Sequence, residues 1–180
     1  MQRTPKHQVL IHDHSERQAN SADPFIVLER QHTVTLGSVR ELDEAARSIR
    51  EKGFTAGAFD SISRAASFLE EFFRKHDALE EKHLFPAVER YDPEQVRAFR
   101  EEHRTIRNLF AGLLSLVRDI EGGRIHGSSV GDLLRTVREI VTLLRRHIIR
   151  ESDILYPLIR KKLSAAEIDS IRKAMPAAEF

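Results

Sequence analysis

The most constraining feature of this chain of 180 residues is a spacing of histidine and glutamate that occurs twice. His32 is followed 44 residues later by His76, and His76 begins His-x-x-x-Glu, which ends at Glu80. The second copy starts 71 residues after the first and consists of His103, His147 and Glu151. Each copy has a similar tail, Leu-Phe-Pro at 84–86 and Leu-Tyr-Pro at 155–157. Such a chain must fold so that two repeats bring the same residue types to equivalent places.

Four segments with helical periodicity carry these residues. Apolar side chains recur at steps of three and four, as they do on one face of an α-helix. The segments span about 24–52, 59–91, 93–121 and 130–163. Asp-Pro pairs at 23–24 and 92–93 are typical helix starts, because Asp caps unpaired N–H groups and Pro fits the first turn. Gly53 is expected to end the first helix.

We therefore predict an all-α protein, an antiparallel up-down-up-down four-helix bundle over residues 23–163. Residues 1–22 are polar and are expected to form a mobile N-terminal arm. Residues 164–180 are expected to form a short C-terminal helix and tail. That helix is predicted to start at Ser164, where Glu167 completes a capping box.

The spacing of 44 residues has a geometric meaning in such a bundle. About 18 residues lead from His32 to the end of its helix, and about 18 lead from the start of the next helix to His76. Arms of equal length, roughly 27 Å at about 1.5 Å per residue, return the chain to the same height. The same count holds for His103 and His147, so the four histidines are predicted to share one inward-facing layer.

Residues of these types in one buried layer indicate a metal site. A His and a Glu four residues apart lie on one face of a helix, so imidazole and carboxylate converge inside the bundle. Four imidazoles with two carboxylates suit two metal ions, and these ligand types fit iron as well as zinc or manganese. The alternative, in which the core accommodates each polar side chain separately, is weak because an unpaired buried carboxylate is costly.

Composition excludes several other kinds of site. The chain has no cysteine, which rules out disulfides, thiolate zinc sites and iron–sulfur clusters held by this chain. A net charge of +1 without a long run of Lys and Arg gives no indication of nucleic acid or an anionic membrane as partner. No segment approaches the roughly 20 apolar residues that span a bilayer, and residues 1–20 lack an apolar signal stretch. We therefore expect a cytoplasmic protein, and we find no heme, flavin or nucleotide motif.

The motif is similar to the HHE pattern of the hemerythrin-like family, over roughly residues 24–160. In that pattern a His precedes His-x-x-x-Glu, the unit is repeated, and Leu-Phe-Pro often follows. The resemblance implies a non-heme centre of two iron ions, also bridged by an oxygen atom, in a four-helix bundle. It implies that Glu80 and Glu151 bridge the ions and that two histidines complete each one.

One departure from the family's oxygen carriers bears on function. Those proteins have a fifth histidine in a His-x-x-x-His pair on the third helix, whereas here Phe99 and Arg107 flank His103 at four residues. The set of four His and two Glu looks more like relatives linked to nitric oxide, repair of iron–sulfur proteins, peroxide chemistry or iron sensing. Fewer protein ligands leave open metal positions, which binding and turnover need.

Two functions remain open from the sequence. The first is a di-iron protein that binds and reduces or senses a small ligand such as O2, NO or peroxide, with an external reductase as electron source. It would be a di-iron oxidoreductase of the NO reductase or peroxidase type. The alternative is an iron or oxygen sensor, or an oxygen-binding module, that acts through a partner without turnover.

Residues near the six predicted ligands have weaker signals. His83 lies three residues after Glu80 and is expected to donate a hydrogen bond to a bridging carboxylate or a bound ligand. Tyr156, nine residues after His147, is expected on the opposite helical face, without a role in the site. An apolar pocket for a small gas is predicted from Leu36, Phe72, Phe73, Phe99, Ile106, Phe110 and Leu144.

Overall fold

The computed structural model describes residues 23–124 and 126–175. The predicted N-terminal arm, residues 1–22, lies outside the described residues, as do residue 125 and residues 176–180. Throughout the described residues the secondary structure is helical, so the prediction of an all-α protein is confirmed.

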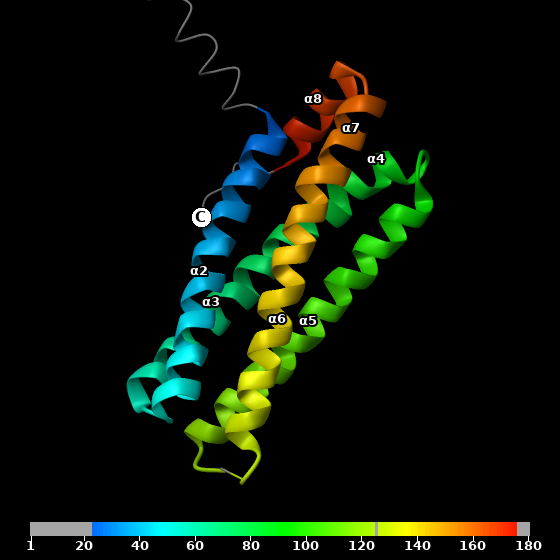
Figure 1. The fold of residues 1–180 in the computed structure, drawn as a ribbon. Coiled ribbons are helices and arrows are strands. Elements are labelled where there is room, and N and C mark those ends of the chain that lie inside the picture. Colours follow the sequence, from blue (N-terminus) through cyan, green and yellow to red (C-terminus); the bar gives the residue numbers. More distant parts are fainter. Residues whose placement is uncertain (1–22, 125, 176–180) are drawn as a thin grey trace, which may run out of the picture.

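Four long helices lie side by side along one axis (Figure 1). They are α2 (Pro24–Lys52), α3 (Ala56–Leu79), α5 (Pro93–Glu121) and α6 (Ser129–Arg150). Contacts join α2 to α3, α3 to α5, α5 to α6 and α6 back to α2, so the helices enclose a common core. The shorter α8 (Ala165–Ala174) contacts α2 at the end of the molecule where α2 begins.

The helix ends follow the signals in the sequence. The Asp23 carboxylate accepts a hydrogen bond from the N–H of Phe25 at 2.9 Å, and Asp92 accepts one from the N–H of Gln95 at 3.0 Å. Gly53 ends α2 at a φ of 86°, a left-handed conformation that favours glycine. The predicted capping box of Ser164 and Glu167 is present at the start of α8.

The second and fourth predicted helices are interrupted by π-helical turns. η1 (Glu80–Leu84) separates α3 from α4 (Phe85–Glu89), and η2 (Glu151–Leu155) separates α6 from α7 (Tyr156–Lys162). In each turn an N–H donates to the carbonyl five residues earlier, from Phe85 to Glu80 and from Tyr156 to Glu151. The prediction of unbroken helices here was wrong. The prolines of the two tails lack the N–H that an α-helix would use next, which favours an interruption at these places.

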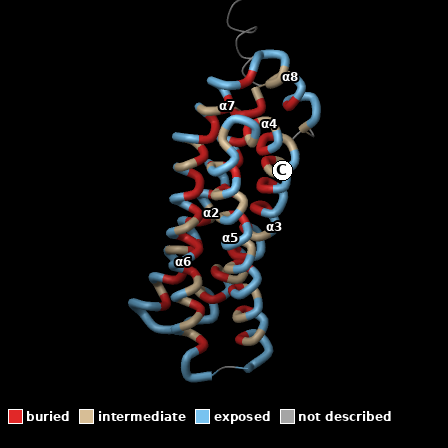
Figure 2. Tube along the Cα trace, turned by 90° about the vertical axis from the view of Figure 1, so that its right-hand side faces the viewer, coloured by how far each residue is buried: buried red, intermediate tan, exposed pale blue. Residues whose placement is uncertain are grey.

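The core is divided into two apolar clusters. The larger one is formed by all four long helices and contains Leu42, Ile62, Leu113 and Ile140. The smaller one lies toward α8 and contains Leu84, Phe85, Phe99 and Tyr156. Buried residues face inward along the whole length of the bundle (Figure 2). A layer of buried polar side chains lies between the two clusters.

Candidate metal centre

The structure brings the six predicted ligands together in this polar layer. Four come from the long helices, and the two glutamates are the first residues of the π-turns. The positions are His32 on α2, His76 on α3, His103 on α5, His147 on α6, Glu80 on η1 and Glu151 on η2. None of these side chains is more than 6% exposed. The prediction that the two repeats return to one height is therefore matched by the geometry.

The histidines form two facing pairs. The Nε2 atoms of His32 and His76 lie 3.2 Å apart, and those of His103 and His147 lie 3.1 Å apart. Two imidazole nitrogens bound to one ion at about 2.0–2.1 Å and at right angles are about 3 Å apart. Each pair therefore has the spacing that two neighbouring ligands of one metal ion need.

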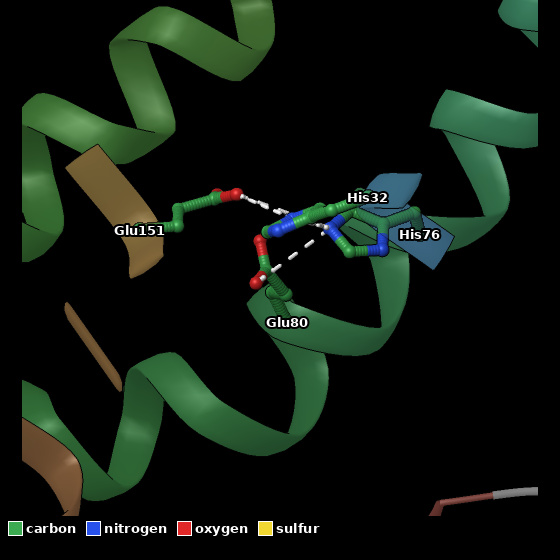
Figure 3. Close-up of side chains that lie close together, drawn as sticks. All are labelled: His32, His76, Glu80 and Glu151. Atoms are coloured by element: carbon green, nitrogen blue, oxygen red, sulfur yellow. Dashed lines mark hydrogen bonds and ion pairs between the residues drawn. The ribbon is translucent and has the colours of Figure 1, made fainter. Parts of the chain in front are cut away.

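Each carboxylate turns one oxygen toward each histidine pair. Glu151 Oε2 lies 3.0 Å from Nε2 of His32, and Oε1 lies 2.8 Å from Nε2 of His147. Glu80 Oε1 lies 3.7 Å from Nε2 of His76, and Oε2 lies 3.5 Å from Nε2 of His103. Figure 3 shows His32, His76, Glu80 and Glu151 converging on one space. The donor atoms of either histidine pair, with one oxygen from each carboxylate, lie within 4.8 Å of one another.

Three of the four imidazoles are held by a hydrogen bond at the ring nitrogen that faces away from this space. The Nδ1–H of His76 donates to Gln31 Oε1 at 2.7 Å. The Nδ1–H groups of His103 and His147 donate to Glu81 and Glu102, both at 2.9 Å. Such a bond fixes the tautomer and leaves the Nε2 lone pair for a metal. These hydrogen bonds therefore orient three of the rings as ligands.

The charges around His103, His147 and Glu151 raise the pKa of both imidazoles and lower the pKa of the carboxyl. Burial alone would lower the pKa of His147, but the charge of Glu151 and the hydrogen bond to Glu102 raise that pKa to about 9. Burial also opposes ionisation of Glu151, yet the neighbouring histidines hold its pKa well below the usual range. Metal binding would therefore displace protons from the imidazoles.

Several buried atoms of the layer lack a hydrogen-bond partner. Within residues 23–124 and 126–175 these include Glu80 Oε2 and both carboxylate oxygens of Glu151. The two oxygens of Glu151 lie within 3.0 Å of an imidazole nitrogen without making a hydrogen bond to it. Lone pairs that face a shared space rather than an N–H are typical of ligands grouped around a cation. The donor set therefore fits a pair of metal ions bound by nitrogen and oxygen.

Tyr156 lies in the site, so the prediction that it faces away was wrong. Its hydroxyl donates to Glu80 Oε1 at 2.8 Å and lies 3.4 Å from Nε2 of His32. The ring stacks on His32 with centroids 5.7 Å apart. The cause is η2, because a π-turn inserts one extra residue and rotates everything after it relative to an unbroken α-helix. The repeated Leu-Tyr-Pro tail was the signal in the sequence.

His83 is half-buried in η1 and belongs to neither ligand group. In the part of the chain that the structure describes, no hydrogen bond joins it to Glu80 or Glu151. Burial lowers its pKa. Its proposed role at the carboxylates stays a prediction, while Tyr156 makes the contact that was expected of His83.

The predicted apolar pocket residues are buried around the layer, apart from one. Phe73 contacts His103 and His147 edge to face, with ring centroids 5.6 and 5.9 Å apart. Phe99 meets His147 in the same way at 5.8 Å. The others are Phe72, Ile106, Phe110 and Leu144. Leu36 is 37% exposed, and Thr35 takes the inward position on α2.

Residues beside the ligands were missed because their partners are far away in sequence. Gln31 and Glu102 each precede a predicted ligand by one residue, and Glu81 follows one. The two-fold repeat of the spacing could have identified Gln31 and Glu102, which lie 71 residues apart. Arg107, at the position of the missing fifth histidine, contacts the buried Asp77 and Glu81 instead.

A groove of about 650 Å³ between α2 and α3 lies apart from this layer, lined by residues such as Glu44, Arg64 and Phe68. It contains none of the six predicted ligands. Among the described helices, none combines the length and apolar character needed to cross a membrane.

Comparison with known families agrees with the site. Residues 23–159 match the model of the hemerythrin HHE cation-binding domain. No curated protein matches the chain.

Proposed function

Since this chain belongs to the hemerythrin HHE cation-binding domain family, we propose that it is a non-heme di-iron protein. Its ligands are His32, His76, Glu80, His103, His147 and Glu151. The protein binds a small ligand, namely O2, NO or peroxide, and reduces or senses it. The observation that carries this proposal is that two groups of metal-binding side chains share both carboxylates.

Six protein ligands for two ions leave positions for a small molecule. Bound iron would supply exchangeable electrons and a Lewis-acidic position for that molecule. The chain itself supplies orientation and exclusion of water, because Phe73, Phe85 and Phe99 pack directly on the imidazoles. The Tyr156 hydroxyl places a hydrogen-bond donor on the His32 side of the site. Electrons for reduction would come from an external reductase.

We also propose that the four long helices of the bundle are arranged up-down-up-down. The colour sequence in Figure 1 supports it, because successive long helices run in opposite directions along the same axis. Residues 1–22, the bundle over 23–163 and the C-terminal segment 164–180 are proposed as the three parts of the chain. A cytoplasmic location is proposed as well.

The test is metal analysis combined with an absorption spectrum of protein expressed with iron. We expect two irons per chain, and we expect His76→Ala and Glu151→Ala to lose iron. His126→Ala is the matched control, because His126 is exposed in the loop before α6 and belongs to neither ligand group. Its iron content should equal that of the wild type.

The same preparation distinguishes the kinds of function. Reduced protein is mixed with NO, O2 or hydrogen peroxide in excess over iron, with an electron donor present. Repeated consumption of the ligand indicates an enzyme, whereas reversible binding at one ligand per site indicates a carrier or sensor. A folded protein that binds zinc but no iron would refute the di-iron proposal.

A further inference from the structure

The two halves of the repeat differ at the positions that contact the outer faces of the histidines. An offset of 71 residues relates His76 to His147, and it also relates Gln31 to Glu102. Both contacts are conserved in geometry, because each histidine donates its Nδ1–H to the residue on the preceding long helix of its half. The acceptor is a neutral amide in one half and a carboxylate in the other.

His103 and His32, the second pair of equivalent histidines, also differ in the partner of Nδ1, and again the carboxylate is on the His103/His147 side. The Nδ1–H of His103 donates to Glu81. The equivalent of His103 is His32, and the equivalent of Glu81 is Ser152. Nδ1 of His32 is buried and has no hydrogen-bond partner within the described chain. Carboxylates thus support both histidines of the His103/His147 pair and neither histidine of the His32/His76 pair.

A third difference lies at the aromatic residues of the tails. Phe85 stacks on His103 with centroids 5.3 Å apart, and its equivalent Tyr156 stacks on His32 at 5.7 Å. Only Tyr156 carries a hydroxyl, which donates to Glu80 Oε1, the oxygen that faces the His32/His76 pair. A carboxylate oxygen that already accepts a hydrogen bond is a weaker metal ligand. Glu80 Oε2, which faces the other pair, has no such donor among the described residues.

From these three differences we infer that the two metal positions are unequal and fill in order, the His103/His147 position first. This inference rests on the proposed function, since it needs two metal ions in the site. A carboxylate that accepts the outer N–H of an imidazole makes that imidazole a more basic ligand. The position with two such carboxylates therefore binds a divalent ion more tightly than the position supported by an amide alone.

Charged groups around the supporting carboxylates do not reverse this order. Arg107 contacts Asp77 and Glu81, and Arg150 contacts Glu102. Glu81 and Glu102 keep their oxygens within hydrogen-bond distance of His103 and His147, whereas Gln31 offers His76 a neutral amide oxygen. The arginines also hold Glu81 and Glu102 in place, which keeps their oxygens on the histidines.

The test is a calorimetric titration of chelator-treated full-length protein with Zn(II), which avoids redox chemistry. We expect two ions per chain, with the first bound at least about 10-fold more tightly than the second. With histidine labelled by ¹⁵N, one equivalent of Zn(II) should shift the NMR signals of His103 and His147 before those of His32 and His76.

Reciprocal variants change the order without removing a ligand. Glu102→Gln should weaken the first affinity by about 10–100-fold, the range measured for such supporting partners. Gln31→Glu should tighten the second affinity, a gain that misfolding cannot produce. Glu101→Gln is the control, because it removes an exposed carboxylate one residue away on the same helix.

The outcomes distinguish a failure of this inference from a failure of the proposed function. Two ions of equal affinity, or filling of the His32/His76 position first, would overturn the inference and leave the proposed function intact. Affinities that do not respond to Glu102→Gln or Gln31→Glu would also overturn it. Binding of one ion or none would overturn both.

Discussion

Replacing Tyr156 by Phe tests the most unexpected contact of the structure. The change removes one hydroxyl and nothing else, so it leaves no cavity of appreciable size. Phe is also sterically acceptable, because Phe85 occupies the equivalent place in the other half and stacks on His103 in the same manner. The loss is therefore confined to the hydrogen bond from the hydroxyl to Glu80 Oε1 and its longer contact with Nε2 of His32.

The magnitude follows from the burial of both partners. Tyr156 and Glu80 are both 0% exposed, so water cannot replace the lost donor. A hydrogen bond to a charged group contributes about 1.5–3 kcal/mol. For a protein of this size, each kcal/mol shifts the melting temperature by about 2–4 °C, so we expect a decrease of about 3–12 °C in metal-free protein.

The assay is thermal unfolding of chelator-treated protein followed by circular dichroism. The chain has two tyrosines, and Tyr91→Phe is the matched control because Tyr91 is 43% exposed. That variant should stay within about 0.5 kcal/mol of the wild type. If Tyr156→Phe melts at the wild-type temperature, the hydroxyl does not bind Glu80, and the π-turn does not place Tyr156 in the site.

Three further predictions concern the whole layer. Metal-free protein should lose stability as the pH rises from 7 through about 9. A raised His147 pKa contributes stability that is complete below its usual 6.5 and is lost through the folded value of about 9; equal urea midpoints at pH 7 and 10 would contradict this. Removing metal present at about 100 times its Kd should cost about 2.7 kcal/mol, or about 5–11 °C in calorimetry, and no decrease would mean that metal does not bind the folded state. Phe73→Leu should change the rate of NO binding in stopped-flow experiments while metal content stays constant, and an unchanged rate would exclude Phe73 from the access path.

The sequence was sufficient to predict the fold class and to predict that the six residues lie together in one buried layer. The rise per residue in an α-helix is constant. The helix segments on the two sides of each loop are therefore equally long, and the spacing of 44 residues places the two histidines of each copy at the same height. The helix ends were predictable for a similar reason. Asp23, Gly53 and Asp92 act through local backbone chemistry, which depends on the immediate neighbours alone.

The position of Tyr156 could not be obtained from the same rule. Nine residues at 100° each place it opposite His147, and the rule holds only while the helix stays α-helical. The π-turn at Glu151–Leu155 breaks that condition. The residues that contact the outer ring nitrogens were also missed, since Glu81 and Glu102 meet histidines of other helices. Such pairs depend on helix packing rather than on spacing within one segment.

Both π-turns begin at the glutamates of the site, and this coincidence has a physical reason. Before the turn, the helical face that carries His76 or His147 must be polar. After the turn, the same face must rejoin the apolar cluster through Phe85 or Tyr156. One extra residue per turn makes both possible, because it rotates the following side chains toward the core. The α-helix before the turn thus aims the carboxylate at the histidine pairs, and the turn closes the layer with an aromatic ring. A hydroxyl on one of those rings is then enough to make the two halves of the site chemically different.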